Sequence, residues 1–305
     1  MTCTPSSSSR FAIGVTTVSC SATDVTGHTA TGEFTVTVEP FVPGAVVTAN
    51  SAGPYHTCAL VGDGTGRCWG YNSSGQLGNG TDNTRSNVPV TVTGLSGAVA
   101  VVAGYNHSCA VIDDGTARCW GINTFGQLGD GTTIDANVPV VVNGLSGAVA
   151  ISAGSGRSCA LIDDGTARCW GSNVGNGTTT NSVVPVNVTG LDGATAITSG
   201  ADHTCALIED GTARCWGSNS FGALGNGTDN GPPVPVTVPG LTGAVAITAG
   251  SFQTCALIGD GTARCWGRND GGQLGDGTTT SSNVPVTVSG LTRAVAITAS
   301  GSHTC

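Results

Sequence analysis

One stretch of the chain decides its fold: Thr254-Cys255-Ala256-Leu257-Ile258-Gly259-Asp260-Gly261-Thr262-Ala263-Arg264-Cys265-Trp266. Its two ends, 254–258 and 262–266, are short runs without helical spacing. Between them stand Gly, Asp and Gly, which favour a tight turn. The stretch therefore predicts a β-hairpin with a cysteine in each strand and a tryptophan at its end.

The hairpin belongs to a unit that recurs along the chain. The tetrapeptide Arg-Cys-Trp-Gly occurs five times, and its tryptophans are spaced by 51, 50, 46 and 50 residues. The third interval is short because 172–177 lacks four residues that the other copies use for a glycine-rich loop. A period of about 50 residues indicates a repeat architecture. The five tryptophans are Trp69, Trp120, Trp170, Trp216 and Trp266.

Two further strands complete each unit. In the copy from Ala244 to Arg293, a strand of small residues at 244–249 precedes the hairpin, and 284–288 follows it as a fourth strand. Pro285 suits an outer edge, because proline cannot donate to a ladder. Four short strands per unit predict the blades of an all-β propeller. A helical solenoid is excluded, since no 3.6-residue periodicity appears.

The recurring motifs extend from about Ala45 to Cys305. They read His203-Thr204-Cys205-Ala206-Leu207, Asp210-Gly211-Thr212, Cys215-Trp216-Gly217-Ser218-Asn219 and Gly126-Gln127-Leu128-Gly129. These motifs resemble the repeats of the regulator of chromosome condensation family in their bacterial, cysteine-containing form. The resemblance implies a β-propeller, commonly of seven blades.

Five full repeats and a partial sixth are expected within 45–305. The sixth begins at Ala294 and stops at Cys305, which leaves that cysteine without a partner. We therefore expect a propeller that is truncated at its C-terminus. The alternative is a closed ring of five blades, in which a strand at 294–298 seals against 45–49.

Residues 1–39 do not follow the repeat. Phe34-Thr35-Val36-Thr37-Val38 alternates as a strand does, and 14–24 reads Gly-x-Thr-Thr-Val-x-Cys-x-Ala-x-Asp. This pattern resembles the C-terminal half of a hyalin-repeat domain, an immunoglobulin-like β-sandwich. The resemblance implies a partial sandwich over 1–39, with a disulfide between Cys3 and Cys20. Residues 40–44 are expected to form a linker.

The other cysteines come in pairs ten residues apart. If the hairpin turn takes three residues, the two cysteines of a pair lie directly opposite each other and can be bridged. A metal site would require Cys-x-x-Cys spacing or a histidine cluster, and neither occurs. Disulfides persist in oxidising compartments, so an exported protein is expected. The pairs are Cys58 with Cys68, Cys109 with Cys119, Cys159 with Cys169, Cys205 with Cys215, and Cys255 with Cys265.

The tryptophans and histidines are interpreted as structural. Strand alternation places each tryptophan between blades, with its indole edge partly wet. A histidine stands two residues before four of the cysteines, but Arg157 and Gln253 occupy the same slot in other copies. A ring of metal ligands would not survive those replacements, whereas a hydrogen bond to the backbone would. The four histidines are His56, His107, His203 and His303.

Composition excludes several classes of function. Lysine is absent and the net charge is −9, so a phosphate backbone or an anionic membrane would be repelled. No apolar run reaches the roughly 18 residues of a membrane span. No catalytic constellation, metal site or cofactor motif is recognised, so the protein is not expected to be an enzyme.

Three functions are compatible with these features. The first is a non-catalytic extracellular or cell-surface module for binding or adhesion, which presents its loops to a protein or glycan. The second is a structural protein that self-associates into fibres or a surface layer by strand complementation. The third is guanine-nucleotide exchange on a small GTPase, which the family resemblance implies for eukaryotic members. Those members use a wedge loop and basic tails that this chain lacks.

Overall fold

The structure is a computed structural model, and it describes residues 2–4, 14–38, 47–82 and 85–305. The chain divides into two compact units, Met1–Val46 and Val47–Cys305. In the described ranges strands dominate, and one short 3-10 turn, η1 (Ser220–Gly222), stands beside them. No described helix has the length and hydropathy needed to cross a membrane.

The N-terminal unit is a small antiparallel sheet of three strands. β1 (Thr2–Thr4) pairs with β2 (Gly14–Thr23), and β2 pairs with β3 (Thr29–Val38) through ten consecutive residue pairs. Cys3 lies directly opposite Cys20, and the two form a disulfide. The described residues of this unit form one sheet, so the second layer of a sandwich and the hyalin-repeat identity stay predictions. The linker expected at 40–44 lies outside the described residues.

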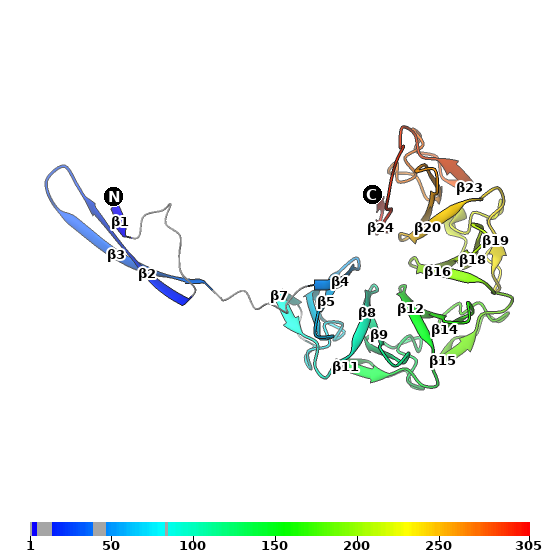
Figure 1. Cartoon of the computed structure of the whole chain (residues 1–305), viewed down its shortest axis with the longest axis horizontal. Helices are drawn as coiled ribbons and strands as arrows, with labels where there is room; N and C mark the ends of the chain where they lie inside the picture. Colours follow the sequence, from blue (N-terminus) through cyan, green and yellow to red (C-terminus); the bar gives the residue numbers. More distant parts are fainter. Residues whose placement is uncertain (1, 5–13, 39–46, 83–84) are drawn as a thin grey trace. The chain divides into compact units, whose positions relative to one another are not determined.

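The second unit contains five sheets of four antiparallel strands, each in sequence order. We call these sheets blades 1 to 5. Figure 1 shows them side by side around a common centre, with the first strand of each blade innermost and the fourth outermost. The predicted propeller of four-stranded blades is therefore confirmed. The blades are β4 (Val47–Ala52), β5 (His56–Val61), β6 (Gly66–Tyr71) and β7 (Arg85–Thr91); β8 (Ala98–Ala103), β9 (His107–Ile112), β10 (Ala117–Gly121) and β11 (Ala136–Val141); β12 (Ala148–Ala153), β13 (Arg157–Ile162), β14 (Ala167–Gly171) and β15 (Ser182–Asn187); β16 (Ala194–Ser199), β17 (His203–Ile208), β18 (Ala213–Gly217) and β19 (Val236–Thr237); and β20 (Ala244–Ala249), β21 (Gln253–Ile258), β22 (Ala263–Gly267) and β23 (Ser282–Thr287).

The sixth repeat contributes one small hairpin. β24 (Ala299–Ser300) pairs with β25 (His303–Thr304), and 294–298 forms no strand. The alternative of a five-bladed ring required a strand at 294–298 sealed against the first blade. The structure does not contain that strand, and β24 pairs with β25 instead.

The turn between the second and third strands sets the register of each blade. In blade 2 the Asp114 carboxylate accepts hydrogen bonds from the Thr116 N–H (2.9 Å) and hydroxyl (2.6 Å). These bonds hold the pKa of Asp114 below its ordinary value. Gly115 has a φ of 76°, a left-handed conformation that glycine adopts without strain. The register that results places Cys109 directly opposite Cys119.

Five disulfides join the second and third strands, one in each blade. They link Cys58–Cys68, Cys109–Cys119, Cys159–Cys169, Cys205–Cys215 and Cys255–Cys265, with Cα atoms 4.0–4.1 Å apart. These are the pairs expected from the spacing. Cys305 is free and exposed.

The hydrophobic core lies between blades rather than inside one. One cluster joins Leu77, Val92 and Leu95 of blade 1 and the connection that follows it to Trp120 of blade 2, and the next two clusters repeat the pattern. The sheet register shifts between Cys119 and Gly121, so the tryptophan sits at a bulge. Blades 2 to 5 therefore each bury their tryptophan against the preceding blade.

Candidate functional site

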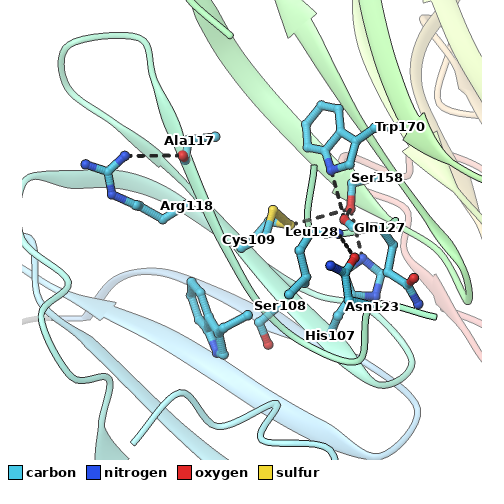
Figure 2. Close-up of a disulfide and its surroundings, with 12 residues drawn as sticks. His107, Ser108, Cys109, Ala117, Arg118, Asn123, Gln127, Leu128, Ser158 and Trp170 are labelled. Carbon is cyan, nitrogen blue, oxygen red and sulfur yellow. Dashed lines mark hydrogen bonds between the residues drawn. A yellow bond between two sulfur atoms is a disulfide. The ribbon is translucent and has the colours of Figure 1, made fainter. Parts of the chain in front are cut away.

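The tryptophans of blades 2, 3 and 5 lie at hydrogen-bonded junctions with the preceding blade. At the junction of blades 2 and 3, the Trp170 indole N–H donates to the Gln127 carbonyl at 2.8 Å. The Ser158 hydroxyl donates to the same carbonyl at 2.9 Å, and His107 Nε2 lies 2.9 Å from Ser158 Oγ (Figure 2). Because the single Ser158 proton is used on the carbonyl, His107 donates from Nε2.

Two other junctions repeat this arrangement. Ser108 and Trp120 donate to the Gln76 carbonyl, both at 2.9 Å, and His56 lies 2.6 Å from Ser108. Thr254 and Trp266 donate to the Ala223 carbonyl, and His203 lies 2.8 Å from Thr254. His56, His107 and His203 thus bond to a hydroxyl of the next blade, not to the backbone as expected, whereas His303 is exposed.

The expectation of partly wet indole edges is wrong for four tryptophans. Trp120, Trp170, Trp216 and Trp266 are 0% exposed. A glycine of the preceding blade packs against each indole, and a Cβ at Gly129 would lie 2.8 Å from Trp170. Trp69 of blade 1 is partly exposed. Burial of the indole therefore requires both the preceding blade and a glycine in its loop.

The junction of blades 3 and 4 differs from the others. Here Arg157 replaces the histidine, and the loop at 172–177 is four residues shorter. The buried Trp216 indole N–H finds no acceptor among the described residues. Arg157 is fully buried, and burial lowers its pKa to about 10. Its charge is balanced by Asp202, whose carboxylate lies 3.7 Å from the guanidinium.

The histidine–hydroxyl pairs do not form catalytic dyads. His107, Ser108 and Ser158 are 0% exposed, so no substrate reaches them. Burial lowers the pKa of His56 to about 4 and that of His107 to about 3, which makes both poor general bases near neutral pH. The Ser108 and Ser158 hydroxyls also donate their hydrogen bonds to backbone carbonyls. These groups hold the blades together.

Aromatic side chains gather at one end of the blades, which we call the loop face. It is formed by the connections between first and second strands and between third and fourth strands. Every Tyr and Phe from residue 47 onward lies on or beside these connections. Two clusters are present, and Arg268 lies 5.3 Å from the centre of the Phe221 ring. The six residues are Tyr55, Tyr71, Tyr105, Phe125, Phe221 and Phe252.

The first cluster lies over blades 1 and 2. Tyr55 packs against Tyr71 and Tyr105, with ring centres 6.3 and 6.1 Å apart. The second cluster lies over blades 4 and 5, where Phe221 and Phe252 are 5.7 Å apart. Tyr55, Phe125 and Phe221 remain about half exposed. These rings offer apolar surface to a partner.

The innermost strands line a cavity of about 500 Å³ that opens at the loop face. It is lined by the last residues of β4, β8, β12, β16 and β20, by connections that follow these strands, and by 298–301 and His303 of the sixth repeat. From blade 2 onward, these connections are linked by backbone hydrogen bonds to the next repeat. Tyr105 N–H donates to Gly154 O (3.2 Å), Ser155 N–H to Ala201 O (3.0 Å), Ala201 N–H to Ser251 O (3.1 Å), and Ser251 N–H to Gly301 O (2.7 Å).

The described residues contain no group of three or more His, Cys, Asp or Glu side chains placed to hold a metal ion. The site is therefore an aromatic surface around a polar cavity. Sequence reasoning did not single out this surface. The available signal was positional, because Phe125 and Phe221 both stand five residues after a repeat tryptophan.

The fold and the site define a disulfide-bonded repeat β-propeller with one aromatic loop face. The sequence matches the family model described as "Regulator of chromosome condensation (RCC1) repeat" over residues 68–111, 114–161, 210–257 and 260–305. A second family model of the same repeat matches residues 47–76, 98–127, 148–177, 194–223 and 244–273. The chain belongs to the RCC1 repeat family.

Curated relatives share a part of this chain. The Protein RCC2 homolog of Danio rerio is 40% identical over 83 residues, which are 27% of this chain and 17% of the relative. The probable E3 ubiquitin-protein ligase HERC4 of Homo sapiens is 41% identical over 81 residues, 26% of this chain and 8% of the relative. The matched stretches therefore span less than a fifth of these relatives.

Solved structures share the fold. Human WBSCR16 has a TM-score of 0.75 at 22% identity, over 96% of this chain and 83% of that one. Prp20p of Saccharomyces cerevisiae has a TM-score of 0.72 at 22% identity, over 85% of this chain and 67% of that one. The latter structure is described together with the binding of Prp20p to Gsp1p and histones. At this identity the likeness establishes the propeller fold alone.

Proposed function

We propose that this chain is a non-catalytic binding module of an exported protein, which presents its loop face to an extracellular protein or glycan partner. The observation that carries the proposal is the placement of all six Tyr and Phe side chains of the propeller on one face. Aromatic residues are enriched among the residues that dominate binding energy, because they bury a large area at low entropic cost.

The framework supports such a surface. Loops carry recognition when a rigid scaffold positions them, and here five disulfides and the buried tryptophan junctions supply that scaffold. Six disulfides in all favour an oxidising compartment, in accord with the proposed extracellular or cell-surface location. Prp20p, a propeller of the same fold, is described as binding proteins. The partner proposed here is a different one, since this chain is acidic and disulfide-bonded.

The proposal is tested with the oxidised chain against a displayed library of extracellular ectodomains and a glycan array. The triple variant Tyr71→Ser, Phe125→Ser, Phe221→Ser removes rings that are 45%, 46% and 51% exposed. We expect it to weaken binding to any selected ectodomain by at least about tenfold.

The matched control lies at the other end of the inner strands. Val99→Ser, Val149→Ser, Val245→Ser removes apolar groups of similar exposure, 57%, 54% and 59%, beside the hairpin turns. This control is expected to bind as the parent does. The proposal is overturned if no probe binds, or if both variants lose binding equally. Thiol titration must show one reactive cysteine in each variant, because only Cys305 is free.

A further inference from the structure

The cavity at the centre of the loop face is lined by neutral polar groups. One position near the end of the inner strands carries a hydroxyl in blades 1, 3, 4 and 5, and so does the equivalent residue of the sixth repeat, whereas blade 2 has Val102 there. Among the described lining residues none is Asp, Glu, Lys or Arg, and His303 of the sixth repeat is the one imidazole. The lining therefore offers no carboxylate, ammonium or guanidinium partner to an ionic ligand, which favours a ligand that is polar and uncharged. The recurring hydroxyls are Ser51, Ser152, Thr198, Thr248 and Thr298.

Several of these hydroxyls keep a proton for a ligand. Ser51 Oγ accepts the Ala103 N–H at 3.0 Å, and Thr198 Oγ1 accepts the Ala249 N–H at 3.1 Å. An oxygen that accepts from a neighbouring strand still has its own O–H to donate. Ser152 and Ser300 have no side-chain hydrogen bond within the described part of the chain, so both can donate and accept.

An aromatic ring lies at the cavity mouth. Tyr105 of blade 2 lines the cavity, and its hydroxyl is hydrogen-bonded to the Ser251 hydroxyl of blade 5. Burial raises the pKa of Tyr105, so the phenol remains neutral. Tyr55 packs edge-on against it and fixes the ring. The mouth thus combines an apolar aromatic surface with hydroxyl donors and acceptors.

We infer that this cavity binds a neutral carbohydrate of one or two rings, an inference that rests on the proposed binding function and names its ligand class. A sugar presents hydroxyls in several directions and an apolar C–H face. The sugar hydroxyls can bond to the Ser and Thr hydroxyls around the cavity, and the C–H face can pack against the Tyr105 ring. The cavity volume of about 500 Å³ lies within the usual range of small-molecule sites. The backbone bonds that link the connections hold these groups in place before binding, which reduces the entropic cost.

A neutral peptide is the other class that an uncharged polar cavity would accept. Peptide side chains require apolar subsites, whereas this lining consists mainly of Gly, Ala, Ser and Thr. Carbohydrate is therefore favoured. The two classes are separated in the experiment by N-acetyl-tetra-alanine amide, a peptide without charge at either end.

The test uses the full oxidised chain and a panel of neutral mono- and disaccharides built from glucose, mannose, galactose and N-acetylglucosamine. Saturation-transfer NMR detects binding and calorimetry measures it. We expect at least one sugar to bind, and glucuronate to bind more weakly than glucose. Ser152→Ala with Ser300→Ala is expected to weaken that sugar at least about fivefold, because two hydrogen bonds are lost. Tyr105→Ala is expected to weaken it similarly.

Two controls keep the outcome specific. Ser96→Ala with Ser146→Ala removes exposed hydroxyls at the opposite end of the blades and should leave sugar affinity within about twofold. The Tyr71, Phe125, Phe221 triple variant should also keep the sugar. The inference is overturned if no sugar binds, if the control pair loses affinity as the cavity pair does, or if only N-acetyl-tetra-alanine amide binds. None of these results alters the separate test of the outer aromatic surface.

Discussion

Trp170 and Trp216 occupy the same position in successive blades but differ in one hydrogen bond. The Trp170 indole donates to the Gln127 carbonyl, whereas the buried Trp216 indole has no described acceptor. Trp→Phe removes similar volume at both sites, so the difference isolates the bond. We expect Trp170→Phe to lower the free energy of unfolding by about 1 kcal/mol more than Trp216→Phe. Urea denaturation measures both, and equal losses would contradict the assignment of the hydrogen bond.

The buried histidines make stability depend on pH. Burial lowers the pKa of His56 to about 4 and that of His107 and His203 to about 3, from an ordinary 6.5. Between about pH 6.5 and 4 the unfolded chain therefore binds protons that the folded chain does not. The free energy of unfolding should fall as pH falls through this window, by up to about 1.4 kcal/mol per pH unit for each histidine.

The chain itself offers the control for this pH dependence. Gln253 occupies the histidine slot in blade 5, so His→Gln at 56, 107 and 203 introduces a residue that the repeat already accepts. Stability of the triple variant, measured by urea denaturation from pH 7 to pH 4, should change much less steeply. An unchanged slope would show that other groups carry the effect.

The sequence predicted that the histidines and tryptophans are structural, but it did not predict which groups they contact. Arg157 and Gln253 in the histidine slot argued against metal binding. The hydroxyls that the histidines contact are about 50 residues away, in the next blade. Which carbonyl meets Trp170 depends on the length of the preceding loop, and spacing along one repeat does not encode that contact.

At the scale of the element, the hairpin closed by Cys159 and Cys169 is the unit that the disulfide stabilises. Closing a loop of this size removes entropy from the unfolded chain. Replacing both cysteines by alanine should lower the free energy of unfolding by about 3 kcal/mol in the chain-entropy model. Denaturation of oxidised protein measures the loss, with a free-thiol count of one confirming that the other bridges remain. A loss below about 1 kcal/mol would contradict a stabilising role.

The strands were more predictable than the connections between them. Period-2 runs and Asp-Gly-Thr turns define the hairpins, and the register then follows from the turn length. The fourth strand is less uniform, because β19 has two residues where its counterparts have six or seven. Pro232 and Pro233, which lack N–H groups, precede it. The strand suggested at 294–298 does not form. In blade 5 the equivalent strand β20 pairs with β21 of its own blade, whereas in the described sixth repeat β25 pairs only with β24.

At the scale of the whole second unit, stability is expected to be highest in the middle. Repeat proteins gain stability from nearest-neighbour interfaces, and blade 3 has a neighbour on each side. Blade 1 keeps Trp69 partly exposed, and the fifth cluster contains three buried residues, Cys255, Cys265 and Leu274, against eleven in the first. Native-state hydrogen exchange should therefore protect amides of β13 and β14 more strongly than those of β5 and β6 or of β21 and β22.

Substitution of a tryptophan between two blades is a second test of the expectation that interfaces between neighbouring blades determine local stability. Trp170 joins blades 2 and 3, so Trp170→Ala should raise exchange rates in both β9–β10 and β13–β14. No blade precedes Trp69 in the part of the chain that the structure describes, so Trp69→Ala should raise exchange in blade 1 alone and cost less stability. Uniform exchange across all five blades, or an equal response to the two substitutions, would mean that the propeller opens as one cooperative body. Individual interfaces between blades would then not determine the local stability of the blades that they join.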